Sequence, residues 1–249
     1  MRLQGKTALV TGATSNIGRA IAVAFAAEGA HVVVAGRDKA RGDAVVAEIE
    51  VAGGRADFVA ADLDGAEAAR ALAADATRIL SRVDILVNNA GLVDGSATTD
   101  VTEETFDRLF AVNVKAPYFL VGALAPAMAE RGGGTIINLG SWIARLGIPI
   151  GSLYSATKGA LETLTKAWAA EFGPRGVRVN AISPGVVHEL SLAHTPAAAM
   201  MNGTPAGAPG KPDAIAHAAV YLASDEAAFV HGSTLDVDGG RQNVAVIAE

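Results

Sequence analysis

Short, almost continuously apolar runs alternate along the chain with longer, alanine-rich segments. Apolar runs of this kind are typical of parallel strands that helices cover on both faces of a sheet. The predicted strands are Thr7–Val10, His31–Ala35, Asp57–Ala60, Ile85–Val87, Thr135–Leu139, Val177–Ile182 and Thr234–Val237. The predicted helices are Ile17–Glu28, Lys39–Ala52, Ala66–Ser81, Thr102–Ala129, Ser152–Phe172 and Pro212–Leu222.

This alternation predicts the fold class and the domain organisation. Repeated strand–helix units favour an α/β fold of Rossmann type, a doubly wound and mostly parallel sheet of about seven strands with helices on both faces. No linker, repeat or low-complexity tract divides the sequence, so we expect residues 1–249 to form one domain. The long connection Gly185–Gly210 interrupts the alternation of strands and helices. We expect residues 186–210 to be a substrate-binding loop or lid, with a surface excursion as the alternative.

Composition and charge count against several classes of function. The chain has 249 residues, of which 51% are hydrophobic and 18% charged, so it can bury a large core. Its formal net charge of −6 argues against binding to nucleic acid or to an acidic membrane surface. Without cysteine it forms no disulfide. The sequence has no uninterrupted apolar run of about 18 residues, so we expect no membrane span, and its first residues lack signal-peptide features. We therefore expect a cytoplasmic location.

The first predicted strand runs directly into the sequence TGATSNIG, which is typical of a dinucleotide-binding turn. Gly12 permits a tight turn and Gly18 permits close packing of the helix, so backbone N–H groups can meet a pyrophosphate. Asn16 stands where glycine is preferred, but asparagine also adopts the left-handed backbone region, so the turn can persist. The alternative is an ordinary strand-to-helix turn.

The second predicted strand ends with Gly36 and Arg37. A guanidinium at this point can hold a 2′-phosphate, whereas an acidic residue would bind the ribose hydroxyls of NAD. The sequence therefore favours NADP(H) over NAD(H). Asp38 counts against this preference, and Arg37, Lys39 and Arg41 could also be the solvated start of the next helix.

Tyr154 and Lys158 lie four residues apart in the sequence YSATK. On a helix they would share one face, with Cβ atoms roughly 5–6 Å apart. A nearby ammonium favours the phenolate, so the sequence predicts a lowered pKa for Tyr154 and a proton donor and acceptor usable near neutral pH. The alternative is an exposed pair, because this spacing arises by chance in many helices.

The chain contains further motifs whose order and spacing resemble those of the short-chain dehydrogenase/reductase family over nearly its whole length. These motifs are ADLD with Asp62, NNAG at Asn88–Gly91, NVKAPYFL with Asn113, NLGS with Ser141, YSATK, and SPG at Ser183–Gly185. The resemblance implies an enzyme that transfers a hydride between a nicotinamide cofactor and a carbonyl or alcohol. It also implies a catalytic set, which is Asn113, Ser141, Tyr154 and Lys158.

The resemblance assigns a role to each member of this set. Tyr154 protonates the carbonyl oxygen, and Ser141 holds the same oxygen. Lys158 lowers the pKa of Tyr154 and binds the nicotinamide ribose, while Asn113 fixes a water in a proton relay. The implied cofactor-binding residues are Gly12, Thr14, Ser15, Asn16, Ile17, Gly18, Arg37, Asp62, Leu63, Asn89, Ala90, Gly91, Tyr154, Lys158, Pro184, Gly185 and Val187.

We expect the substrate to be a small or medium, mainly apolar ketone or alcohol. The predicted pocket residues are Val93, Trp142, Leu153, Val186 and Met200, with Ala144, Leu146 and Met201 as further apolar candidates. No metal site is expected, because the five histidines lack ligand spacing. Glu189 departs from the family pattern, since it stands about where a threonine would anchor the nicotinamide carboxamide; His188 or Ser191 could substitute. Ala208 also stands where relatives commonly have an arginine.

Two alternatives to this function remain open. One is a 3-oxoacyl-thioester reductase of the acyl-carrier type, to which Arg131 and Arg145 could contribute basic contacts. The other is a non-catalytic, NADP(H)-binding regulatory protein of the same fold. For either function the resemblance implies a homo-oligomer, a tetramer built by the long helices at Thr102–Ala129 and Ser152–Phe172.

Overall fold

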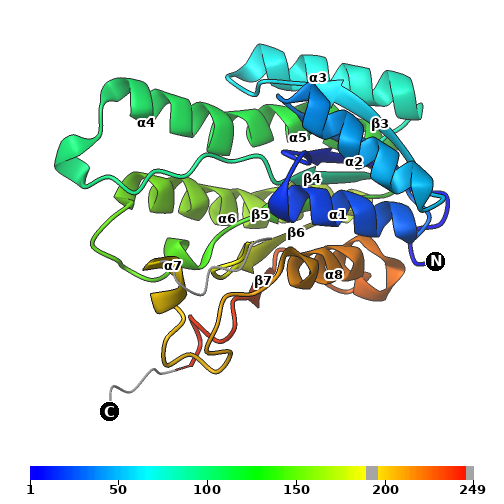
Figure 1. Cartoon of the computed structure of the whole chain (residues 1–249). Coiled ribbons are helices and arrows are strands. Elements are labelled where there is room, and N and C mark those ends of the chain that lie inside the picture. Colours follow the sequence, from blue (N-terminus) through cyan, green and yellow to red (C-terminus); the bar gives the residue numbers. More distant parts are fainter. Residues whose placement is uncertain (189–195, 245–249) are drawn as a thin grey trace.

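Seven parallel strands form one sheet in a computed structural model of the chain (Figure 1). The structure describes residues 1–188 and 196–244. The order of the strands across the sheet is β3-β2-β1-β4-β5-β6-β7. The strands are β1 (Thr7–Thr11), β2 (His31–Gly36), β3 (Arg55–Ala60), β4 (Ile85–Asn88), β5 (Gly134–Leu139), β6 (Val177–Pro184) and β7 (Thr234–Val237). The predicted α/β fold of Rossmann type is confirmed, with a sheet that is parallel throughout.

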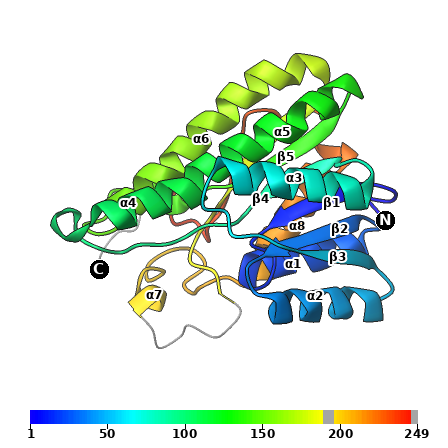
Figure 2. The same ribbon diagram turned by 90° about the horizontal axis from the view of Figure 1, so that it is seen from above.

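Helices cover both faces of this sheet (Figures 1 and 2). Residues of α1, α2 and α8 pack in one apolar cluster, and residues of α3, α5 and α6 pack in another. The helices are α1 (Asn16–Ala27), α2 (Lys39–Val51), α3 (Ala66–Leu80), α4 (Glu103–Phe110), α5 (Ala116–Glu130), α6 (Ser152–Phe172), α7 (Pro196–Ala199) and α8 (Pro212–Ala223). Short 3₁₀ turns at Thr98–Asp100, Trp142–Ala144, Gly173–Arg175 and Asp225–Ala227 complete the described elements.

Most strands contribute side chains to both apolar clusters, because successive side chains point to opposite faces of a sheet. In β2, Val32 and Val34 belong to the cluster under α1 and α8, while Val33 and Ala35 belong to the cluster under α3, α5 and α6. All four side chains are buried. When both faces of a strand are buried, apolar and polar residues do not alternate along it. This explains why these strands appear in the sequence as continuous apolar runs.

The helix predicted at Thr102–Ala129 is interrupted. A π-helical turn at Ala111–Lys115 separates α4 from α5. Pro117 has no N–H group and cannot donate to the carbonyl of Asn113, so regular α-helical pairing fails at this residue. The interruption matters for function because it carries the predicted site residue Asn113 in its centre.

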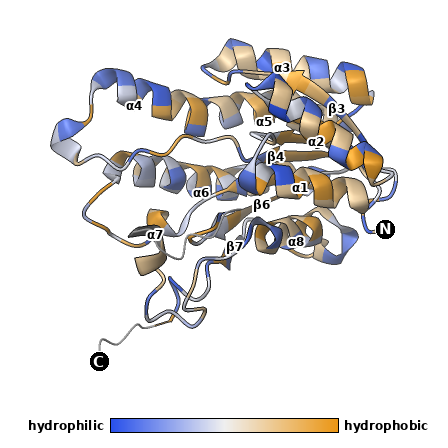
Figure 3. Cartoon of the chain, in the orientation of Figure 1, coloured by the Kyte–Doolittle hydropathy of each residue, from blue (hydrophilic) through white to orange (hydrophobic). Residues whose placement is uncertain are grey.

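By length and apolar composition alone, the helical run Glu103–Glu130 could cross a membrane. A core helix of a globular protein passes the same test, and half of the apolar window is buried inside this fold. Figure 3 shows hydrophilic residues on α4, at the start of the run.

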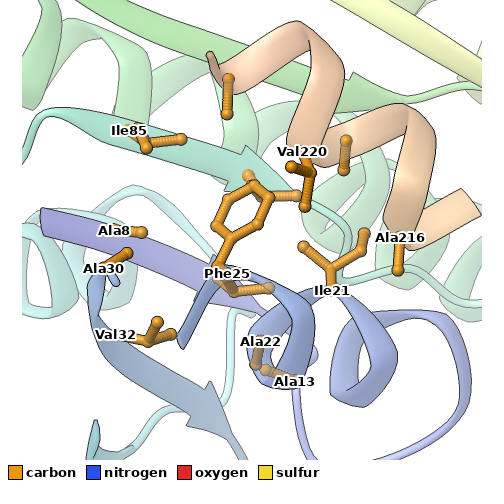
Figure 4. Packing of buried hydrophobic residues seen from close by; sticks show 14 of the residues in the cluster. Ala8, Ala13, Ile21, Ala22, Phe25, Ala30, Val32, Ile85, Ala216 and Val220 are labelled. Atoms are coloured by element: carbon orange, nitrogen blue, oxygen red, sulfur yellow. The ribbon is translucent and has the colours of Figure 1, made fainter. Parts of the chain in front are cut away.

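We predict that Phe25 is a main support of the cluster under α1 and α8. Its side chain is fully buried, and Figure 4 shows the ring among Ile21, Ile85 and Val220. Phe25→Ala should lower the free energy of unfolding in urea by about 3–5 kcal/mol, because it removes apolar contacts and leaves a cavity. Phe229→Ala is the matched control: Phe229 is fully exposed, and its removal should change stability by less than about 0.5 kcal/mol. Equal effects of the two changes would contradict this packing.

Candidate active site

The turn between β1 and α1 has the backbone that the sequence predicts. Gly12 has φ +62°, and Asn16 has φ +47°, which confirms that asparagine takes the left-handed conformation here. A Cβ atom on Gly12 would lie 2.8 Å from the Cα of Ala90, and one on Gly18 would lie 2.2 Å from the carbonyl oxygen of Gly12. Both glycines are therefore required by close approach of backbone, which is the arrangement that lets a phosphate lie against a helix N-terminus.

Asn89 fastens the end of β4 to this turn. Its Nδ2 donates to the carbonyl oxygens of Thr11 (2.8 Å) and Gly12 (3.0 Å). In return, the Thr11 hydroxyl oxygen accepts hydrogen bonds from the backbone N–H groups of Asn89 and Ala90, both at 3.0 Å. The ends of β1 and β4 are thus held together at the point where the strand order reverses, which is where α/β sheets bind ligands.

The N-terminus of α1 is chemically suited to an anionic cofactor. Ser15 is the N-cap residue but its side chain makes no capping hydrogen bond. The Oδ1 atom of Asn16 is buried and has no hydrogen-bond partner among the described residues. An uncapped helix N-terminus beside bare glycine backbone fits the pyrophosphate of a dinucleotide.

A cavity of about 720 Å³ runs along the carboxyl ends of six strands, β1 to β6. All predicted cofactor-binding residues line it, as do Ser141 and four of the five pocket residues of the prediction: Val93, Trp142, Val186 and Met200. The segments that meet here are far apart in the sequence, because parallel strands all present their carboxyl ends at one edge.

Several predicted pocket residues do not line this cavity. Leu153 is buried and directly precedes Tyr154, so it points to a different side of α6. Met201 is also buried, and its Cε lies 2.9 Å from where a Cβ on Gly239 would be. Ala144 and Leu146 are likewise absent from the lining.

Tyr154 and Lys158 share one face of α6 and both reach the cavity. The Lys158 Nζ lies 5.7 Å from the centroid of the Tyr154 ring. It donates to the carbonyl oxygen of Leu139 at 2.7 Å. Ser141 follows the end of β5, is buried, and forms a side-chain hydrogen bond with Tyr154. Three of the four predicted catalytic side chains therefore meet at one end of the cavity.

The pKa of Tyr154 departs from the sequence prediction in direction. Burial raises it above the usual value, and the hydrogen bond with Ser141 only partly opposes this. The expected lowering by Lys158 is not among its causes, and the Lys158 Nζ donates to the Leu139 carbonyl. At neutral pH Tyr154 is thus a neutral phenol, the form that can give up a proton.

Lys158 is an unusual cation because it is buried and forms no ion pair with any residue in the described part of the chain. Its side chain is 4% exposed, and burial lowers its pKa to about 8. An ammonium has three donors, and the hydrogen bond to Leu139 accounts for one of them. Among residues 1–188 and 196–244 the Nζ donates to no other group, so two donors remain for a ligand in the cavity that Lys158 lines.

Asn113 lies beside this group but behind the cavity lining. Its Oδ1 accepts from the backbone N–H of Leu92 (2.8 Å), and its Nδ2 donates to the Leu92 carbonyl (2.9 Å) and to Thr157 Oγ1 (3.0 Å). A Cβ on Gly91 would lie 3.5 Å from both Asn113 Oδ1 and Lys158 Nζ. The polar end of Asn113 therefore faces the same glycine as the ammonium does.

The opposite end of the cavity is rich in arginine. Arg37 and Arg41 line it, and so does Arg108, whose Nη2 lies 2.6 Å from Asp62 Oδ1. A Cβ on Gly36 would lie 2.6 Å from the Thr14 Cγ2, so a side chain at position 36 would crowd Thr14. The cationic residues here fit an additional phosphate on the adenosine ribose.

Arg41, Arg108, Ile148 and Ile150 also line the cavity, although no motif in the sequence marked them as site residues. Arg41 follows Arg37 by four residues, across the start of α2, and could have been found from that spacing. Arg108 comes from α4, and no local pattern connects it with Asp62.

On the nicotinamide side, β6 ends in a tightly held turn. Gly185 donates its N–H to the Val237 carbonyl (3.0 Å), and a Cβ on Gly185 would lie 2.6 Å from the Cα of Asp238. Val187 forms a parallel bridge with Gly210, which closes the loop of residues 186–210 at its base. Glu189, Ser191 and His194 lie outside the described residues. In the described part of the chain, no cluster of three or more carboxylates and imidazoles is arranged to hold a metal ion.

Comparison with known proteins identifies the family. The family model described as enoyl-(acyl carrier protein) reductase matches residues 12–242. An uncharacterized oxidoreductase of Methylorubrum extorquens is 42% identical over 96% of this chain and 98% of the relative. The galactitol 2-dehydrogenase (L-tagatose-forming) of Cereibacter sphaeroides is 41% identical over 96% of each chain.

A solved structure agrees with these sequence relatives. It is that of a blue fluorescent protein from a metagenomic library in complex with NADPH, at 33% identity and a TM-score of 0.92, covering 97% of this chain and 99% of that one. The fold, the cavity and these relatives lead to one conclusion. The chain belongs to the short-chain dehydrogenase/reductase family and is an NAD(P)-dependent oxidoreductase that interconverts alcohols and carbonyls.

Proposed function

We propose that the protein is an NADP(H)-dependent carbonyl reductase or alcohol dehydrogenase in which Tyr154 is the general acid and base. One observation carries the proposal: a neutral, partly buried phenol, a buried ammonium and a serine hydroxyl meet at one end of a dinucleotide-sized cavity. The cofactor would supply the hydride when bound. We propose that Tyr154 gives its proton to the substrate oxygen and that Ser141 holds that oxygen.

Lys158 supports this proton transfer electrostatically. When Tyr154 gives up its proton, negative charge develops on the phenol oxygen. Although Lys158 is not among the groups that lower the Tyr154 pKa in the structure, we propose that its ammonium, on the same helix face, stabilises this charge during the transfer. The low dielectric of the buried site makes this interaction stronger than it would be in water. We propose that Lys158 then passes a proton to the Tyr154 phenolate and regains one from a water held by Asn113, whose Oδ1 faces Gly91 together with Lys158.

The substrate end of the cavity supports an apolar substrate of small or medium size. Val93, Ile148, Ile150 and Met200 line it together with Trp142. The Asp94 carboxylate in the same wall already accepts hydrogen bonds from the hydroxyl and the backbone N–H of Ser96. Among the described lining residues, the arginines lie at the adenosine end of the proposed cofactor site, so the substrate end has no basic cluster for an anionic substrate.

The contacts of two arginines count against the acyl-carrier alternative. Arg145 forms ion pairs with Glu162 (3.2 Å) and Asp236, and Arg131 donates to the carbonyl of Val83 (2.9 Å). Both guanidinium groups are thus engaged within the fold, and Arg131 lies near the amino edge of the sheet, away from the cavity.

We also propose that residues 1–249 act as one domain and that the domain forms a homotetramer. The pairing of all seven strands in one sheet supports the first point. Exposed aromatic rings on α4 and α5 support the second, because Phe106 and Tyr118 are 46% and 51% exposed on adjoining helices.

We predict that Tyr154→Phe lowers carbonyl reduction by about 100-fold or more and affects turnover far more than NADPH binding, because the proton donor is lost while the ring remains in the cavity wall. The measurement is NADPH and NADH oxidation against a panel of ketones, keto esters and acyl thioesters, together with cofactor binding by fluorescence. Tyr118→Phe is the matched control and should retain full turnover, since Tyr118 is exposed on α5. A Tyr154→Phe variant that keeps its rate would contradict the proposed role, and a wild-type chain that binds NADPH but reduces none of the panel would favour a regulatory protein.

A second prediction concerns the cost of burying Lys158. Lys158→Met should raise the stability of the cofactor-free protein at pH 7 by about 1–2 kcal/mol while abolishing turnover, because an apolar side chain replaces a buried cation without a counter-charge. The lost hydrogen bond to Leu139 offsets part of the gain. Lys166→Met, at an exposed position on the same helix, should change stability by less than about 0.5 kcal/mol.

The pH dependence of this effect has a definite sign. Between the folded-state pKa of about 8 and the ordinary value of 10.5, the unfolded chain binds the Lys158 proton and the folded chain does not. Stability rises with pH wherever the unfolded state binds more protons, so the wild type gains stability across this window. The advantage of Lys158→Met should therefore shrink from pH 8 to pH 10.5 in urea titrations. A variant that is less stable than wild type at pH 7 would show that Lys158 is a structural residue.

A further inference from the structure

The first turn of α2 joins a carboxylate to one of the arginines of the cavity. Asp38 is the N-cap residue of α2, and its Oδ1 accepts from the backbone N–H of Arg41 at 3.0 Å. The other oxygen, Oδ2, accepts from Arg41 Nε at 2.8 Å. A single carboxylate thus starts the helix and also fixes the direction of the guanidinium one turn later.

Of the two paired residues, Arg41 faces the cavity and Asp38 does not. Arg41 lines the cavity together with Arg37, whereas Asp38 is not among the lining residues. Asp38 engages the Nε atom of Arg41, and the two terminal nitrogens of Arg41 have no hydrogen-bond partner within residues 1–188 and 196–244. The pair therefore leaves the bidentate end of the guanidinium free for an anion.

The start of α2 is also held firmly in place. A Cβ on Gly42 would lie 2.1 Å from Cδ2 of Phe58, so the helix presses directly onto β3 beside Arg41. Near the other end of α2, Glu48 accepts two hydrogen bonds from Arg19 of α1, at 2.9 and 2.6 Å. These contacts fix α2 relative to the helix whose N-terminus would bind the pyrophosphate.

We propose that Asp38 is a positioning residue that aims Arg41 at the adenosine ribose, so that Arg37 and Arg41 together form a two-arginine site for the 2′-phosphate of NADP(H). The inference rests on the proposed function and deepens it. From its position after the strand, Asp38 would be expected to select NAD, whereas in this proposal it favours NADP(H).

Chemistry at Asp38 agrees with this role. Its pKa lies below the ordinary value because the backbone N–H and the guanidinium of Arg41 both donate to it, so it stays ionised at neutral pH. A carboxylate whose two oxygens already accept from Arg41 is poorly placed to accept from ribose hydroxyls. An exposed pair of this kind contributes little to stability, so its removal can be interpreted in terms of binding.

The test compares two nucleotides that differ only in the 2′-phosphate. Calorimetric titration of the whole protein with adenosine 2′,5′-bisphosphate and with 5′-AMP requires no turnover. Asp38→Asn keeps a capping side chain but removes the charge that orients Arg41. It should weaken binding of the bisphosphate by about three- to ten-fold and leave 5′-AMP unchanged. Arg41→Ala should weaken the bisphosphate by about ten-fold or more, and again leave 5′-AMP unchanged.

Asp43→Asn is the matched control. Asp43 pairs with Lys39 on the same helix (2.6 Å), and its removal changes the net charge by the same amount. Neither residue of this pair lines the cavity. Asp43→Asn should therefore leave bisphosphate binding unchanged or make it slightly tighter, since it removes a negative charge without disturbing Arg41.

The outcomes separate the two proposals. If Asp38→Asn tightens bisphosphate binding, Asp38 repels the phosphate and the inference is overturned; it is also overturned if Arg41→Ala has no effect. A second outcome is a wild type that prefers the bisphosphate over 5′-AMP by about ten-fold or more, with variants that keep the same preference. In that case the inference about Asp38 and Arg41 fails, while the proposed NADP(H) preference stands. A wild type with no preference for the bisphosphate overturns that preference itself.

Discussion

The contact between the ends of β1 and β4 is the constraint on which the rest of the site depends. Asn89 and Thr11 hold the two strand ends together, and Gly12 lets the first turn pass within van der Waals distance of Ala90. The strand order reverses between these two strands, so a crevice opens there. The strands β2, β3, β5 and β6 contribute to the site by placing their carboxyl ends along this crevice, and α6 contributes Tyr154 and Lys158.

A large part of this arrangement can be predicted from the sequence. Strands buried on both faces give continuous apolar runs, and each predicted strand ends within two residues of its observed bounds. The conformation of Asn16 follows from the turn it must make. The break at Asn113 was missed because the apolar pattern continues through it, although Pro117 carried the signal.

The remaining errors concern groups that come together only in space. The pKa of Tyr154 depends on what surrounds the phenol, and the sequence spacing with Lys158 does not show that the ammonium is directed to Leu139. The pairing of Arg108 with Asp62 joins two elements far apart in the chain. Asp38 was interpreted by its position after the strand, whereas its role as a helix cap and as a partner of Arg41 depends on its local geometry.

The buried Lys158 ammonium, which forms no ion pair within the described residues, is a costly arrangement that a purely structural role would not explain. The most direct test is NMR titration of the protein labelled with ¹³C at lysine Cε, with Lys158→Met used to assign the signal. The account predicts that the Lys158 signal of the cofactor-free protein titrates with a pKa near 8. A pKa near the ordinary value of 10.5 would show that the ammonium is solvated or paired, and would contradict the electrostatic basis proposed for Tyr154.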